Sequence, residues 1–250
     1  MSDILAGAEP FSAAGSGNGV LVLHGFTGTP QSLRGLAEAF AGAGFSVELP
    51  LLPGHGTSVE DMQVTGWEDW CGAAEAAFTE LESRCTNVAV AGLSMGGTLA
   101  CWLAAHHPGI VALVVVNPAV EPPQPPYFDI LHGILDQGIE MTPAIANDIA
   151  DPSGRELAYD RVPVRAALSL AEAQVALAPL LGRIRCPALV MTSRNDHVVA
   201  PAAGDFLAAS VGGPVERVWL ERSYHVATVD YDRDEIEARA AAFLTNAFGC

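Results

Sequence analysis

The chain has 250 residues, of which 50% are hydrophobic and 16% charged, and its formal net charge at pH 7 is −17. So acidic a chain offers no basic stripe for the phosphates of a nucleic acid and no cationic patch for an anionic membrane. A neutral substrate, or one held by apolar contacts, is easier to accommodate. At about 100–200 residues per domain, the length fits one core with an insertion.

The cysteines and the N-terminal region indicate the compartment. The odd number of scattered cysteines indicates reduced thiols, rather than disulfides or a zinc site, and we expect no metal and no other cofactor. The start MSDILAGAEPF lacks a basic region followed by an apolar run. No stretch approaches the roughly 18 apolar residues of a membrane span. We therefore expect a soluble, cytoplasmic protein; the sequence indicates no oligomeric state.

Short apolar runs alternate along the chain with longer helical patterns. Strands are expected over residues 19–25, 45–50, 87–92, 110–118, 186–193 and 214–221. Helices are expected over 29–44, 65–85 and 232–249, and between the third and fourth of these strands. Continuous apolar strands that alternate with helices indicate a mostly parallel sheet covered by helices on both faces.

Residues 118–163 break this alternation. The segment contains several prolines, and we expect no strand in it. A structureless connection of this length is uncommon in a compact domain and is usually functional. The predicted organisation is therefore an α/β core of residues 1–117 and 164–250, with residues 118–163 as a small cap over the active site at one end of the sheet.

The motif that carries chemistry lies between the third of these strands and the helix after it. Gly92-Leu93-Ser94-Met95-Gly96 fits G-x-S-x-G, the sharp strand-to-helix turn that exposes a serine hydroxyl above a sheet. Alone the motif is modest evidence, because glycine is common in this chain. Its position after a buried strand and before a helix makes Ser94 the candidate nucleophile, at a helix N-terminus that favours negative charge.

A serine nucleophile needs a base, and the base needs an acid that orients it. In a fold of this kind the acid and then the histidine follow the serine along the chain. His225 follows the last strand and precedes the last helix, at the sheet edge expected to hold Ser94. Asp196 follows the strand 186–193 and is the candidate acid. The other histidines have simpler explanations, and we interpret Asp230 and Asp232 as caps of the final helix.

Acyl transfer also requires donors for the developing oxyanion. The backbone N–H of Met95, directly after the nucleophile, is the first candidate. The stretch LHGFTGTP after the first strand supplies the second, because Gly25 allows a close approach and places the N–H of Phe26 nearby.

With these residues in place, the chain resembles the α/β-hydrolase superfamily, and within it the bacterial monoacylglycerol lipases and related carboxylesterases. The resemblance rests on LVLHGFTGTP, LPLLPGHGT, GLSMGGTLA, RELAYDRVP, CPALVMTSRNDHVV and SYHVATVDYD, which span residues 21–232. It implies an α/β-hydrolase fold and the same catalytic residues. It also implies that Glu156 binds the glycerol headgroup and that Ile145 lines the acyl channel.

The expected activity is therefore hydrolysis of a small neutral lipid ester, a monoacylglycerol, through an acyl-Ser94 intermediate. A general carboxylesterase without a preference for glycerol is the first alternative. Haloperoxidase-like enzymes and carbon–carbon bond hydrolases share the Ser-Asp-His set, but RELAYD in the cap segment speaks against them. A binding protein that has lost its chemistry would be expected to lack part of the triad.

Overall fold

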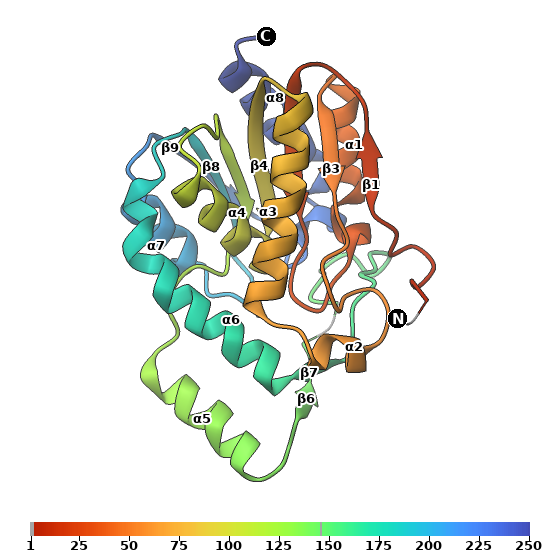
Figure 1. The fold of residues 1–250 in the computed structure, drawn as a ribbon, viewed down its shortest axis with the longest axis vertical. Coiled ribbons are helices and arrows are strands. Elements are labelled where there is room, and N and C mark those ends of the chain that lie inside the picture. The colour runs from red at the N-terminus through yellow and green to blue at the C-terminus, as the bar shows by residue number, and fades with distance from the viewer. Residues whose placement is uncertain (1–2, 146) are drawn as a thin grey trace.

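The computed structural model describes residues 3–145 and 147–250 and is built around one seven-stranded sheet (Figure 1). The strand order is β1-β3-β2-β4-β5-β8-β9, and all neighbours are parallel except β1, which pairs antiparallel with β3. The strands are β1 Phe11–Ala13, β2 Asn18–Leu23, β3 Ser46–Leu49, β4 Asn87–Leu93, β5 Leu113–Val116, β8 Ala188–Ser193 and β9 Val215–Leu220.

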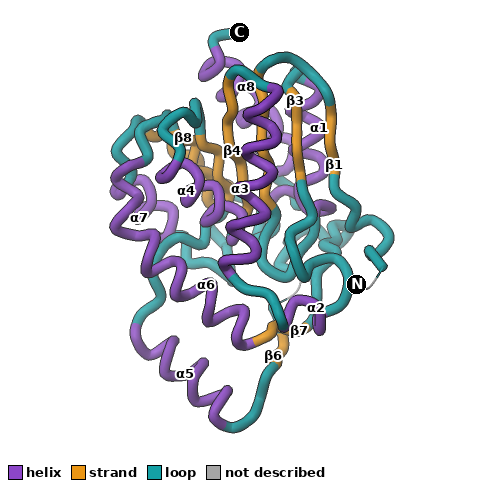
Figure 2. The backbone as a smooth tube through the Cα atoms, in the orientation of Figure 1, coloured by secondary structure: helices purple, strands orange, loops and turns teal. Residues whose placement is uncertain are grey.

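Helices cover both faces of the sheet because its inner strands are apolar on both faces (Figure 2). Along β2, Leu21 and Leu23 point into one hydrophobic cluster, whereas Val20 and Val22 point into the other. The first cluster is completed by α3 Trp67–Arg84, α4 Met95–His106, η2 Ala178–Arg183 and α7 Ala202–Ser210; the second by α1 Arg34–Gly42 and α8 Arg233–Phe248. Three short helices, η1 Pro30–Leu33, α2 Val59–Gln63 and η3 Ala227–Val229, lie in connecting loops.

The α/β-hydrolase arrangement predicted from the sequence is confirmed, and each of the six expected strands is present. The edge strand β1 was not anticipated. It is three residues long and only partly buried, so it carries little of the hydrophobic pattern that identifies a strand.

Residues 118–163 contain more regular structure than expected. They form α5 Pro125–Asp136 and two short strands, β6 Met141–Pro143 and β7 Arg161–Pro163, which pair antiparallel. The expectation of no strand was wrong, because the pairing joins two proline-containing triplets that lie far apart in the sequence. In Figure 1 these elements lie beyond one end of the sheet, and α6 Val164–Leu177 lies between α5 and the core.

One stretch, Val164–Arg183, has the length and composition of a membrane-crossing helix. It consists of α6 and η2, it is half buried, and it packs against α4, α5 and other elements. Core helices of soluble proteins meet the same criterion, so this stretch is weak evidence for a membrane span.

Candidate active site

Ser94 lies in a tight turn between β4 and α4, and its backbone has φ 56° and ψ −119°. Residues with a side chain rarely adopt this conformation. The flanking glycines make the turn possible: a Cβ on Gly92 would overlap the Gly96 carbonyl, and one on Gly96 would overlap the Leu23 carbonyl of β2. The backbone geometry of the turn therefore fits the strained turn that the motif predicts.

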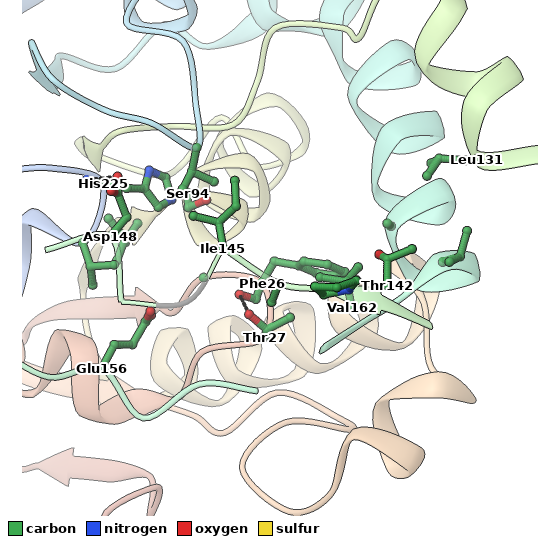
Figure 3. Close-up of a pocket in the computed structure, with 18 of the residues that line it drawn as sticks. Phe26, Thr27, Ser94, Leu131, Thr142, Ile145, Asp148, Glu156, Val162 and His225 are labelled. Carbon is green, nitrogen blue, oxygen red and sulfur yellow. Dashed lines mark hydrogen bonds between the residues drawn. The ribbon is translucent and has the colours of Figure 1, made fainter. Parts of the chain in front are cut away.

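His225 and Asp196 meet beside this turn. Nδ1 of His225 lies 2.7 Å from Oδ2 of Asp196, whose side chain is 1% exposed. The other oxygen of Asp196 accepts the N–H groups of Val198 and Val199, both at 2.8 Å. With Nδ1 donating to the carboxylate, Nε2 of the neutral ring is free to accept a proton, and the ring lies beside Ser94 in Figure 3.

Two residues that the sequence analysis did not single out hold the backbone of His225. Nδ2 of Asn117, directly after β5, donates to the His225 carbonyl at 2.7 Å. Oδ2 of Asp148, between β6 and β7, accepts the His225 N–H at 3.0 Å. Its carboxylate also accepts the His197 N–H at 3.1 Å, and its Oδ1 lies 2.7 Å from Nδ1 of His197. Because these contacts join residues far apart in the chain, no local sequence signal reveals them.

The two aspartates interpreted as caps of the final helix have other roles. Asp232 occupies the N-cap position of α8, but its side chain accepts the N–H groups of Arg222 and Ser223. Asp230 is fully buried and accepts N–H groups from Tyr224, Ala150 and Asp151, among others. It therefore joins the His225 loop to the segment 118–163. The cap interpretation was wrong for both side chains.

The two expected oxyanion donors follow β2 and β4. Met95 is the first residue of α4, so its N–H has no acceptor within the helix. Within the part of the chain that the structure describes, no group accepts the N–H of Phe26. Gly25 lies against Ser94, because a Cβ on Gly25 would be 3.5 Å from the Ser94 Cβ. Both loops are thus adjacent to the serine, as an oxyanion hole requires.

Ser94 and His225 border a cavity of about 360 Å³. Figure 3 shows Glu156 and His225 toward one end of it and Thr142, Val162 and Leu131 toward the other. Burial raises the pKa of Glu156 to about 7, while its electrostatic interaction with the nearby His225 acts to lower it. A carboxyl group of this kind can accept or donate a hydrogen bond near neutral pH.

The resemblance implied roles for two further residues, Glu156 and Ile145. Both line this cavity, but they lie in different surroundings. Glu156 lies against the loop after β2, where a Cβ on Gly28 would be 2.8 Å from its Oε1. Ile145 is 65% exposed. It therefore borders the cavity from the solvent side rather than from the core.

A family model described as "Serine aminopeptidase, S33", a hydrolase family, matches residues 17–232. The chain belongs to this family. It is 43% identical over 249 residues to the thermostable monoacylglycerol lipase of Bacillus sp. (strain H-257), and the match covers 98% of each chain. It is 25% identical over 241 residues to a carboxylesterase of Bacillus subtilis (strain 168), covering 94% of this chain and 96% of that protein.

Solved structures superpose on this chain with the same fold. A structure described with "LipS and LipT, two metagenome-derived lipolytic enzymes" superposes with a TM-score of 0.93 at 41% identity, and covers 98% of this chain and 100% of its own. The monoacylglycerol lipase of Paleococcus ferrophilus superposes with a TM-score of 0.79 at 18% identity, covering 95% and 98%, which supports the shared fold alone.

Proposed function

We propose that this S33-family hydrolase cleaves monoacylglycerols to glycerol and free fatty acid through an acyl-Ser94 intermediate. The observation that carries the proposal is one cavity that contains a strained serine, a histidine paired with an aspartate, and a half-buried carboxyl group apart from an apolar end. The full-length similarity to a monoacylglycerol lipase supports the same substrate class.

In the first half of the reaction, Nε2 of His225 takes the proton of the Ser94 hydroxyl as Oγ attacks the ester carbonyl. Asp196 holds the ring in the required tautomer and stabilises the imidazolium that forms. The N–H groups of Phe26 and Met95 stabilise the oxyanion. When the carbon–oxygen bond breaks, His225 returns the proton to the leaving alkoxide, and glycerol departs.

In the second half, water takes the place of the glycerol beside His225. Its proton passes to Nε2, its oxygen attacks the acyl-Ser94 carbonyl, and the proton then returns to Ser94 Oγ as the fatty acid leaves. No metal or cofactor is needed for either half, because the base and the nucleophile belong to the chain.

The two ends of the cavity suggest how the substrate lies. We place the glycerol hydroxyls beside Glu156, on the His225 side, and the acyl chain toward Leu131 and Val162, with Ile145 at the rim. We assign residues 118–163 as the cap that provides much of this lining. A cavity with one polar and one apolar end suits a small neutral lipid ester as the substrate. We place the enzyme in the cytoplasm because its five free thiols are stable there.

Replacing Ser94 tests the nucleophile. We expect Ser94→Ala to lower kcat by roughly 10³-fold or more, because the covalent intermediate can no longer form. The measurement is ester hydrolysis by purified protein, with circular dichroism as the control for folding. A folded Ser94→Ala variant that keeps most of its activity would show that another residue attacks the ester.

A substrate panel tests the class of ester. Monoacylglycerol, diacylglycerol, triacylglycerol and the ethyl ester of one fatty acid are compared for the wild type and for Glu156→Gln. We expect a strong preference for the monoacylglycerol, reduced by about tenfold in Glu156→Gln, because a hydrogen bond to a charged group contributes about 1.5–3 kcal/mol. Equal rates on the ethyl ester, unaffected by Glu156→Gln, would instead support the alternative of a general carboxylesterase.

A further inference from the structure

A second cavity, of about 440 Å³, meets the first at the nucleophile. The residues that border both are Phe26, Ser94, Tyr127, Ala167 and Val198. From this junction the second cavity extends between α6, the loop after β5 and the start of α7, and its described lining includes neither His225 nor Glu156. The proposed reaction of a monoacylglycerol leaves this space unused.

The position of the base decides which part of an ester could enter the second cavity. The leaving oxygen must lie within reach of His225, because His225 returns the proton to it. The alcohol therefore occupies the first cavity, which contains His225. A group that enters the second cavity must belong to the acyl side of the ester, and the acyl chain has two routes away from Ser94.

The walls of the second cavity combine an apolar surface with hydrogen-bond acceptors. Ala119, Ala171 and Val199 are among its apolar residues. Gln174 also lines it and is only 9% exposed. Nε2 of Gln174 donates to the Ala119 carbonyl at 2.5 Å, which identifies the other amide atom as Oε1.

No group in the described part of the chain donates to this Oε1, so the wall of the cavity offers a hydrogen-bond acceptor that a ligand can use. The carboxylate of Glu121 is a further acceptor in the same lining. A ligand that matches these walls has an apolar body and a hydroxyl group that can donate. A buried hydroxyl without a partner would be disfavoured, so the acceptor selects for this kind of ligand.

We propose that the second cavity is a subsite for the acyl chains of hydroxy fatty acid esters, with the chain against the apolar walls and a hydroxyl at or near its far end donating to Oε1 of Gln174. The proposal rests on the proposed function, since the same Ser94, His225 and Asp196 would cleave these esters. It adds a second class of acyl group to that function.

The test is the ratio of kcat/KM for ω-hydroxyacyl glycerol to kcat/KM for unsubstituted monoacylglycerol of the same chain length, measured over a series of lengths. The matched variants are Gln174→Met, which removes the acceptor at similar length, and Thr142→Val, which removes a hydroxyl from the first cavity. We expect Gln174→Met to lower the ratio by about tenfold at the preferred length, and Thr142→Val to leave it within about twofold.

Ala200→Trp gives an independent check, because Ala200 lines the second cavity from an exposed position where a larger side chain need not disturb the core. We expect it to lower the same ratio at least as much, with folding checked by thermal denaturation.

A ratio unchanged in both Gln174→Met and Ala200→Trp overturns the subsite. A fall confined to Thr142→Val also overturns it, because that result would place the hydroxylated chain in the first cavity. If the wild type cleaves neither ester, the proposed function fails together with the subsite; cleavage of the plain ester alone refutes only the subsite.

Discussion

Four residues with side chains have a positive φ within the described chain; two of them line the cavity and the other two contact residues that line it. They are Thr27, Ser94, Asn117 and Asn147, with φ between 44° and 62°. Such conformations cost about 1–3 kcal/mol each and persist only where the surroundings enforce them. Thr27 follows the Phe26 donor, Asn117 holds the His225 carbonyl, and Oδ1 of Asn147 accepts the Glu156 N–H. The strained residues are thus the nucleophile itself and residues that adjoin or bind the oxyanion donor, the base and Glu156.

The contact between Asp148 and His225 leads to a prediction at the same scale. We expect Asp148→Ala to lower kcat by about ten- to a hundredfold, because the backbone of His225 loses one of the contacts that place the base, and small displacements at this point are costly. Asp148→Asn should recover part of the loss, since its amide oxygen can still accept the N–H of His225. The change should appear in kcat more than in KM.

His197→Ala is the matched control for this prediction. It removes the other partner of Asp148, an exposed side chain, and keeps the bond between Asp148 and the His225 N–H. We expect its kcat to stay within about threefold of the wild type, as for most exposed changes away from a buried contact. Wild-type kcat in Asp148→Ala would mean that Asn117 and Asp196 suffice to orient the base.

Among the elements, α4 packs on the sheet through buried hydrophobic side chains along its length and through glycines at its start. Gly92 and Gly96 let the start of α4 approach β2 and β4 until no Cβ fits between them. The loop at residues 148–151 is attached differently, through side chains that bind loop backbone: Asp148 binds the His225 loop, and Asp230 binds Ala150 and Asp151. The core therefore determines where the nucleophile lies, and polar contacts determine where the cap loop lies.

Two glycine substitutions compare a crowded position with an open one. We expect Gly96→Ala to destabilise the fold by about 3 kcal/mol or more, because the added methyl group would overlap backbone that cannot move independently. Gly133→Ala, in the middle of α5 with open space at the Cβ position, should instead be stabilising or neutral, by up to about 1 kcal/mol. Urea denaturation measures both changes, and equal effects of the two would contradict the close approach at Gly96.

At the scale of the whole molecule, two buried histidines link the loops after β2 and β3. Nε2 of His24 accepts the Leu52 N–H at 3.1 Å, and the ring of His24 lies 5.0 Å from that of His55. Burial lowers the pKa of His24 to about 3 and that of His55 to about 4. The folded protein thus keeps both rings neutral over a range in which the unfolded chain would bind protons.

This difference predicts loss of stability in acid. Below the ordinary histidine pKa of about 6.5 the unfolded state binds more protons, so the free energy of unfolding falls as the pH falls toward about 4. His55→Phe removes one of the two groups and should reduce that slope by up to about 1.4 kcal/mol per pH unit. The measurement is urea denaturation between pH 7.5 and pH 4.5. The same slope in wild type and variant would show that His55 does not contribute.

Much of the fold and the predicted positions of the catalytic groups could be obtained from local patterns. The strands are continuous apolar runs, the G-x-S-x-G spacing around Ser94 lies between a strand and a helix, and chain order selects Asp196 and His225. These signals are local because a strand, a helix or a tight turn is determined largely by neighbouring residues. By contrast, β6 and β7 were missed because each is too short to have a pattern of its own.

The sequence by itself thus determined the fold class, the family and the candidate nucleophile, base and acid. Only the tertiary structure decided that Asp148 binds the N–H of His225 and Asn117 its carbonyl, that Asp230 holds the cap loop, and that two cavities meet at Ser94. These features depend on atoms from segments far apart in the chain. Their contacts exist only once the hydrophobic core has brought those segments together. A local sequence pattern does not show which distant segments will come into contact.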